Sequence, residues 1–290
     1  MEVAVNVEAL IASSIDGLMI GFVYGLAAMG LTLIFGVMRV INLAHGPVIA
    51  IGMFAVLLMS QNLGINPYLG LIVVVFLGLA SGVIMYFVAV HRVLNAPELT
   101  TLLATFSVNL MIIGIGTVVF TTSPRALDVE LGALRTGAIA ILGTKAVAVA
   151  IAIIFTAGLY LFLYRTRLGK SIRAVANNRE AASLMGINGT WVLALSFGIG
   201  ITMAMTSGSL LATLFSFTIL SGTIYEIKSF VIVVLGGLGN PTGALLGGIV
   251  IGLLEGVSSM FIPIGWVPVI EFGVFVLILV VRPTGLFGAR

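Results

Sequence analysis

The sequence has few charged residues and no cysteine, and each shortage excludes a class of protein. Only 8% of the 290 residues are charged, about a third of the roughly 25% typical of soluble domains. Hydrophobic residues make up 60% of the chain, and the mean hydropathy is +1.28. A globular fold of this length cannot bury so much apolar surface, so a soluble enzyme or nucleic-acid-binding protein is excluded. Without cysteine, the chain has no disulfide, thiolate metal site or cysteine nucleophile.

The apolar residues form long runs, as expected for a chain whose main solvent is a lipid bilayer. A transmembrane helix needs about 20 such residues. Runs that reach or approach this length are 10–36, 47–60, 68–90, 100–121, 142–164, 191–215, 229–238, 243–261 and 267–281. The sequence therefore predicts an all-α, polytopic bundle of about eight or nine membrane segments, forming one transmembrane domain over residues 1–290.

Two of these runs, 47–60 and 229–238, are too short to cross a bilayer alone, and each adjoins a break rich in glycine and proline. The breaks read GVMRVINLAHGP (36–47) and GGLGNPTG (236–243). Irregular backbone is tolerated at membrane depth only where protein or water satisfies its polar groups, so paired breaks point to a transport path. The alternative is two ordinary loops, with Asn42 as a helix cap. The candidate pathway residues are Asn42, His45, Gly46, Gly236, Gly237, Gly239 and Asn240.

Two sequence patterns concern how the helices pack. Gly46-Pro47 precedes VIAIG and Asn240-Pro241 precedes TGALLGG, a weak sign of an internal repeat. Glycines also recur at four-residue spacing, which lets helix backbones approach closely, either inside the bundle or at a subunit interface. These glycines are Gly17, Gly21 and Gly25 in the first run and Gly248, Gly252 and Gly256 in the eighth.

Ionisable residues within membrane segments are costly and commonly functional. Lys228, Glu255 and Glu271 fall towards one side of the bundle, where they form either an outer vestibule or an ion pair that joins helix ends. No series of Asp, Glu or His was found across the other runs, which argues against a proton-driven secondary transporter. His45 has no second ligand at metal-binding spacing, so we expect no metal site.

Five of the 13 basic residues lie between Arg165 and Arg179, which predicts that the 165–190 loop is cytoplasmic. Nine crossings then place the N-terminus outside and the C-terminus in the cytoplasm. Within the loop, Asn177 and Glu180 have the spacing of a capping box. We expect a short helix over about 178–185 that ends at Gly186 in the left-handed conformation.

Three stretches resemble one known family. They are GKSIRAVANNREAASLMGIN (169–188), GLTLIFGVMRVINLAHG (30–46) and RPTGLFG (282–288). Together they resemble the permeases of branched-chain amino acid ABC importers, the LivH-like group, and they span nearly the whole chain. Pro47 departs from the small or acidic residue that many relatives have after the His-Gly pair.

The resemblance implies that Asn177 to Asn188 form a coupling helix that docks on a cytoplasmic ATPase. Ala181, Ala182 and Gly186 match small positions that permit close contact, while Arg173 and Glu180 contact the ATPase from the loop surface. The chain has no GxxxxGK[ST] pattern, because Tyr164 stands where Gly169-Lys170-Ser171 would need a first glycine. We therefore expect a non-enzymatic subunit that binds no cofactor, with ATP and Mg²⁺ held by the partner ATPases.

The expected function is import of branched-chain or other small hydrophobic amino acids across the prokaryotic cell (inner) membrane. The implied partners are a second homologous permease, two ATPases, an extracytoplasmic binding protein and membrane lipid, but no nucleic acid. One alternative is an ABC permease for urea or short-chain amides, which shares the NLAHG stretch. Another is a secondary transporter or channel that works without ATPases.

Overall fold

The computed structural model describes residues 7–136, 139–282 and 284–287, and this part of the chain is mainly helical. The helices are α1 (Val7–Met38), α2 (His45–Leu63), α3 (Pro67–Met85) with its π-helical extension η1 (Tyr86–Val90), α4 (Glu98–Phe120), α5 (Gly143–Arg165), α6 (Arg167–Asn177), α7 (Arg179–Leu184), α8 (Gly189–Ala212), α9 (Ser221–Gly236), α10 (Pro241–Ser258), the 3₁₀ turn η2 (Ile264–Trp266) and α11 (Val267–Val281).

Seven of the described helical segments are long and apolar enough to cross a membrane: α1, α2, α3 with η1, α4, α5, α8 and α10. The apolar α9 and α11 are shorter, at 16 and 15 residues. The predicted all-α polytopic bundle is confirmed. The prediction that segment 47–60 is too short to cross a membrane alone is wrong. α2 also includes His45, Gln61 and Asn62, so it spans 19 residues and is long enough.

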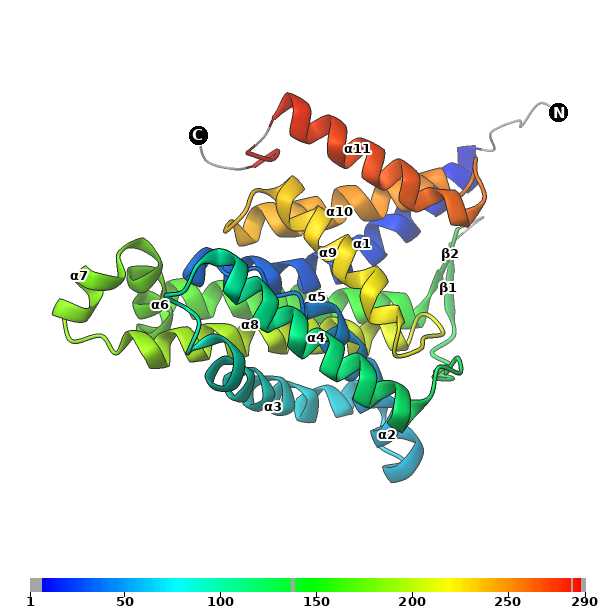
Figure 1. The fold of residues 1–290 in the computed structure, drawn as a ribbon. Coiled ribbons are helices and arrows are strands. Elements are labelled where there is room, and N and C mark those ends of the chain that lie inside the picture. Colours follow the sequence, from blue (N-terminus) through cyan, green and yellow to red (C-terminus); the bar gives the residue numbers. More distant parts are fainter. Residues whose placement is uncertain (1–6, 137–138, 283, 288–290) are drawn as a thin grey trace.

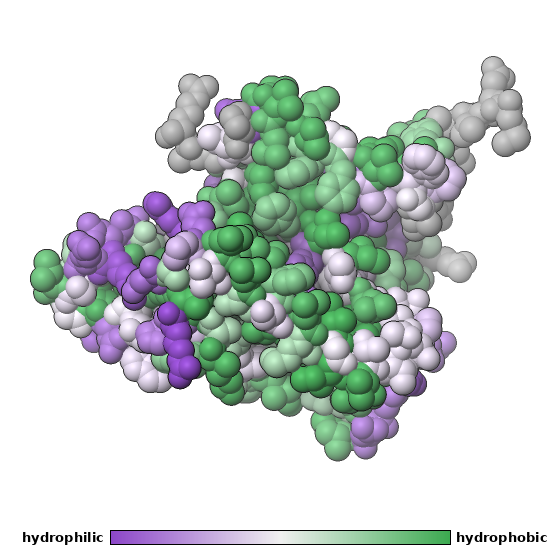
Figure 2. Space-filling model, viewed as in Figure 1, coloured by the Kyte–Doolittle hydropathy of each residue, from purple (hydrophilic) through white to green (hydrophobic). Residues whose placement is uncertain are grey.

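The two ends of the bundle differ in chemistry. Helices α6 and α7 project from one end, which we call the α7 end (Figure 1). A short antiparallel hairpin of β1 (Ala133–Thr136) and β2 (Ile139–Leu142), not expected from the sequence, lies at the other, the hairpin end. Figure 2 shows hydrophobic residues over the middle of the molecule and hydrophilic ones over the α7 end. This is the surface of a chain that spans an apolar layer.

The bundle contains two three-helix units, α1–α3 and α8–α10, that pack in the same pattern. α1 lies antiparallel to α10 and α8 lies antiparallel to α3, while α2 packs on α8 and α9 packs on α1. The units meet where Gly30 approaches Gly200 and where Gly46 approaches Gly222. This inverted arrangement brings the starts of α2 and α9, the middle helices of the two units, together at Gly46 and Gly222.

This pattern corrects the repeat suggested by the sequence. Asn66-Pro67 opens α3 and Asn240-Pro241 opens the corresponding α10, with proline in the first turn of each helix. Gly46-Pro47 instead lies at the start of α2, whose counterpart is α9. The sequence comparison therefore paired the wrong helices.

The glycine stripes pack against each other inside the chain. A Cβ atom added to Gly21 would lie 2.8 Å from the backbone oxygen of Gly248, and Gly17 meets Gly252 and Gly256 in the same way. Close backbone approach maximises van der Waals contact where no hydrophobic effect drives association. Bundle packing is therefore the role of these glycines, rather than a subunit interface.

Candidate functional site

The first break lies well inside the bundle. α1 ends at Met38, and Arg39 follows with a φ of 56°, a left-handed conformation that reverses the chain direction. The non-helical segment then leads to His45, whose Nε2 lies 3.0 Å from the carbonyl oxygen of Ala27. Ala27 lies about three turns, roughly 16 Å, before the end of α1. Residues 39–44 thus lead back from the α7 end, and α2 starts in the interior.

Helix α4 supplies the hydrogen bonds that the broken backbone needs. The Thr105 hydroxyl donates to the carbonyl oxygen of Ile41 at 3.1 Å and accepts from the Leu43 N–H at 3.3 Å. Asn109 Nδ2 donates to the carbonyl oxygen of Leu43 at 2.5 Å. Buried backbone groups without such partners would cost several kcal/mol each in an apolar layer. Thr105 and Asn109 were not among the sequence candidates, although polar residues four apart on one helix face were a usable signal.

Helix α9 brings a carboxylate to the same place. Its Gly222 contacts Gly46 backbone to backbone, so the starts of α9 and α2 meet in the interior. One turn further on, Oε2 of Glu226 accepts a hydrogen bond from Asn109 Nδ2 at 3.1 Å. Glu226 was not among the sequence candidates, although it lies in the same helix α9 as the candidate Lys228 and, like it, before the run 229–238.

A cavity of about 310 Å³ lies beside the break. Asn42, 1% exposed, is one of its two polar lining side chains, and Glu226 is the other. Asn42 Oδ1 accepts from the Ala44 N–H at 3.1 Å, while its Nδ2 has no hydrogen-bond partner among the described residues. The remaining walls come from Leu31, Ile41, Leu43, Leu102, Ile227 and Phe230.

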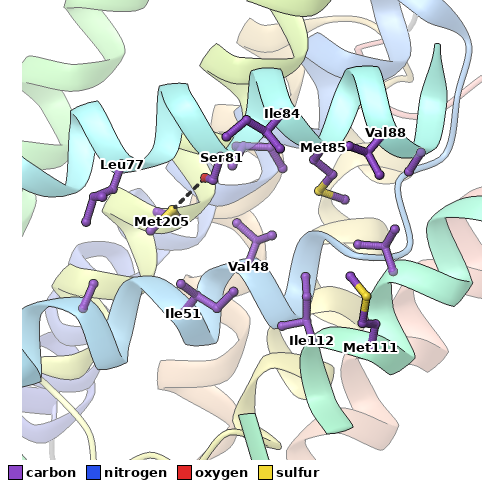
Figure 3. A pocket seen from close by; sticks show the side chains of 14 residues that line it. Val48, Ile51, Leu77, Ser81, Ile84, Met85, Val88, Met111, Ile112 and Met205 are labelled. Carbon is purple, nitrogen blue, oxygen red and sulfur yellow. Dashed lines mark hydrogen bonds between the residues drawn. The ribbon is translucent and has the colours of Figure 1, made fainter. Parts of the chain in front are cut away.

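A second cavity, of about 390 Å³, lies between α2, α3, α4 and α8. Figure 3 shows Val48 and Ile51 facing Met85 and Ile84 across it, with Met111 and Ile112 at one end. Its one polar lining side chain, Ser81, donates to Gly78 O and contacts the sulfur of Met205. Because Ser81 already bonds within the protein, this cavity offers little to a polar cargo. The cavity of about 310 Å³ beside the break is therefore the candidate site.

The structure separates the two sets of pathway residues. Asn42 lines the candidate cavity and Gly46 borders Glu226, whereas His45 binds α1 outside the cavity lining. The second break forms the α9–α10 turn near the α7 end, where Gly239 contacts Gly36. Asn240 Nδ2 donates there to the carbonyl oxygen of Phe287 at 3.0 Å. Of the candidate pathway residues only Asn42 lines the cavity; the others are His45, Gly46, Gly236, Gly237, Gly239 and Asn240.

The three ionisable candidates Lys228, Glu255 and Glu271 form one ion cluster. Lys228 Nζ lies 2.6 Å from Glu255 Oε2 and 3.2 Å from Glu271 Oε1, and it stands over the ring of Tyr24 at 4.5 Å. The side chains of Lys228 and Glu271 are 11% and 6% exposed. The cluster therefore joins α9, α10 and α11 by ion pairs, the second of the two roles considered from the sequence.

The cytoplasmic-loop prediction needs one correction. The N-cap of α7 is Asn178, whose Oδ1 accepts from the Ala181 N–H at 2.9 Å, and Asn177 is instead the last residue of α6. The sequence did not predict α6, and the predicted N-cap of α7 was therefore one residue too early. Gly186 is left-handed as predicted, with φ of 79°. The N–H groups of Gly186 and Ile187 bond to the carbonyl oxygens of Ser183 and Ala182, closing the helix in a Schellman motif.

The small residues of this helix do not share one surface. Ala182 is buried against the chain itself, whereas Glu180, Ala181 and Gly186 are exposed. The most exposed apolar side chains of this segment are Leu184, which is 88% exposed, and Met185, which is 82% exposed. Arg173 stacks on Tyr164 at 4.5 Å, so it also contacts its own chain, and Asn188 caps α8 through the Trp191 N–H.

A bundle of apolar helices with a broken helical segment beside a cavity that holds two polar side chains is typical of a multi-pass membrane permease. Residues 13–281 match the family model described as branched-chain amino acid transport system / permease component. The chain therefore belongs to this family, and it is a transport subunit rather than an enzyme.

The relatives agree with the family assignment. The chain is 31% identical to the high-affinity branched-chain amino acid transport system permease protein LivH of Salmonella typhimurium, over 94% of both chains. It is 27% identical to the corresponding permease protein BraD of Pseudomonas aeruginosa, again over 94% of both. A shorter match, 34% identical over 38% of each chain, is to the ribose import permease protein RbsC of Escherichia coli. No solved structure matches the chain.

Proposed function

We propose that this chain is the permease subunit of an ATP-driven importer of branched-chain or other small hydrophobic amino acids. An extracytoplasmic binding protein would deliver the cargo, and two ATPase subunits would hold ATP and Mg²⁺. The relatives LivH and BraD, which are named as branched-chain amino acid permeases, support the cargo class. The five basic residues between Arg165 and Arg179 support a cytoplasmic α7 end, with α1 starting outside.

The observation that carries the proposal is the end of α7. Leu184 and Met185 are almost fully exposed, although they lie on a helix that is closed at both ends by hydrogen bonds. Exposed apolar side chains on a small preformed helix are suited to a groove on a partner protein. We therefore expect the ATPase contact to come from Glu180, Ala181, Leu184 and Met185. Ala182 instead packs α7 against the rest of this chain.

Packed helices lead from α7 to the break, because α7 packs on α6 and α6 packs on α1. Arg179 at the start of α7 and Arg39, which follows the last residue of α1, line a common cavity of about 230 Å³. Movement of α7 with an ATPase would thus act directly on the segment 39–44, and through it on the candidate cavity.

The surroundings of Glu226 support a second permease subunit. The cavity that Glu226 lines is bordered by Ile227 and Phe230, which are 44% and 38% exposed, so it opens on the surface of this subunit. A hydrophilic area interrupts the apolar surface near α9 (Figure 2). A carboxylate facing lipid is costly, so this face must adjoin protein or a water-filled path. Pairing two permeases here would enclose the path between them.

The experiment is a co-purification of the full complex with α7 altered. Leu184→Asp, alone and with Met185→Asp, should insert normally but lose at least about 90% of the bound ATPase, because a charge would enter an apolar groove. Leu168→Asp, on the neighbouring α6 and 50% exposed, is the matched control. Retention of the ATPase by both α7 variants would contradict the docking role of α7. Failure of the wild-type chain to recruit any ATPase would instead favour a transporter that works without ATPases.

A further inference from the structure

We propose that the cavity beside the break is a binding site for the zwitterionic head of an amino acid. Glu226 would bind the α-ammonium group and Asn42 the α-carboxylate, while the apolar walls hold the side chain. This inference rests on the proposed function and deepens it, since it assigns recognition of the cargo to the permease as well as to the binding protein.

The carboxylate of Glu226 is the first observation. Within the described chain it has one hydrogen bond, from Asn109, and no ion-pair partner. Lys228, two residues later, is engaged by Glu255 and Glu271 instead. A charged group in an apolar layer is stabilised by an opposite charge or by water. A transient ammonium ligand would supply that charge each time a cargo molecule passes.

The amide of Asn42 is the second, independent observation. Its orientation is set by Oδ1, which accepts from the Ala44 N–H. Asn42 lines the cavity, and its Nδ2 is left as a fully buried donor without a partner among the described residues. Buried polar groups in proteins are nearly always paired, so an unpaired donor needs an explanation. A carboxylate oxygen of the ligand is the acceptor that this donor best fits, since hydrogen bonds to charged groups are the stronger ones.

The shape and lining of the cavity complete the match. At about 310 Å³ it lies at the small end of ligand sites, which are typically about 300–1,000 Å³. The apolar lining residues include Leu31, Leu102 and Phe230. One negatively charged acceptor, one donor and an apolar lining correspond to an amino acid with an apolar side chain. Urea and short amides carry no charge, so they could donate a hydrogen bond to Glu226 but would form no ion pair with it.

The test measures uptake by the complete complex with its binding protein, reconstituted in liposomes, using radiolabelled L-leucine and urea. Glu226→Gln keeps the acceptor for Asn109 but removes the charge. Asn42→Asp keeps the acceptor for Ala44 and replaces the free donor with a second acceptor. Each variant should lower leucine uptake about tenfold or more, as expected for the loss of a charge-assisted hydrogen bond. Glu98→Gln, at the exposed start of α4, is the control for removing a carboxylate elsewhere.

A second readout separates recognition from folding and coupling. ATP hydrolysis stimulated by the empty binding protein should stay within about twofold of the wild-type rate in both variants, since neither contacts the ATPase. Leucine uptake unchanged in both variants would overturn this inference and leave the proposed function standing. Uptake of urea but not leucine by the wild-type complex would overturn the proposed cargo and this inference together.

Discussion

The side-chain amide of Asn109 lies 3.1 Å from Oε2 of Glu226, and the same nitrogen donates to the carbonyl oxygen of Leu43. One residue of α4 thus connects the carboxylate of α9 with the irregular backbone between α1 and α2. The three elements are distant in the sequence, and this contact joins them beside the cavity. The stability of the site therefore depends on α4, a helix that is mostly exposed.

Replacing Asn109 should damage the site directly. Asn109→Leu keeps the number and branching of the side-chain heavy atoms but leaves the Leu43 carbonyl oxygen and Glu226 without this donor. Leaving a buried acceptor unpaired costs about 1–3 kcal/mol, so the free energy of unfolding should fall by that amount. Thermal unfolding of the purified complex in lipid nanodiscs measures it. Asn62→Leu, at the exposed end of α2, should leave the unfolding temperature unchanged.

The contact between Gly46 and Gly222 should tolerate no added methyl group. A Cβ atom on Gly46 would overlap the Gly222 carbonyl oxygen and lie inside contact distance of the Glu226 side chain. We expect Gly46→Ala to reduce the yield of folded, monodisperse protein at least about threefold, because overpacking costs about 1–3 kcal/mol. Size-exclusion chromatography with fluorescence detection measures the yield.

Gly158→Ala is the matched control for that experiment. Gly158 lies within α5 with no heavy atom within 4 Å of its added Cβ. Alanine is the better helix former by about 1 kcal/mol, so this variant should be as abundant as the wild type or more so. Equal yields of Gly46→Ala and Gly158→Ala would show that α2 and α9 do not meet as closely as described.

The ion cluster of Lys228 makes an asymmetric prediction. Lys228→Met leaves Glu255 and Glu271 close together and without their cation, which should cost about 3–5 kcal/mol. Glu271→Gln leaves one cation and one carboxylate, so it should cost less than about 1 kcal/mol. Unfolding temperatures of the two variants give the comparison, and a larger effect for Glu271→Gln would contradict the cluster. Combining Lys228→Met with Glu255→Gln and Glu271→Gln should recover most of the lost stability.

The N-cap of α7 can be tested by two adjacent substitutions. Asn178→Ala removes the hydrogen bond to the Ala181 N–H and should destabilise α7 by about 1 kcal/mol. Hydrogen exchange of the α7 amides should then be about fivefold faster, and ATPase recruitment should be weaker. Asn177→Ala changes the last residue of α6, which has no such bond, so exchange in α7 should be unaffected. Faster exchange in α7 after Asn177→Ala, but not after Asn178→Ala, would show that Asn177 is the N-cap instead.

The sequence was informative wherever the signal is local. Long apolar runs predicted the membrane helices because each span must be apolar by itself, and Gly186 ended α7 because glycine adopts positive φ without strain. Boundaries failed where polar residues lie inside helices. α9 begins at Ser221, but the charged residues Glu226 and Lys228 interrupt its apolar pattern. The predicted segment therefore began eight residues late, at 229, and did not include Glu226.

The sequence by itself determined that the chain lies in a membrane, that one break contains Asn42 and His45, and that one short helix is offered to a partner. Only the tertiary structure decided which polar groups meet. It brought Asn42 and Glu226 to one cavity, joined Glu226 to Asn109, placed Asn240 outside that cavity, and paired the glycines of α1 with those of α10. The reason is physical: hydropathy and capping act between neighbours along the chain, whereas hydrogen bonds and close packing depend on how the helices cross.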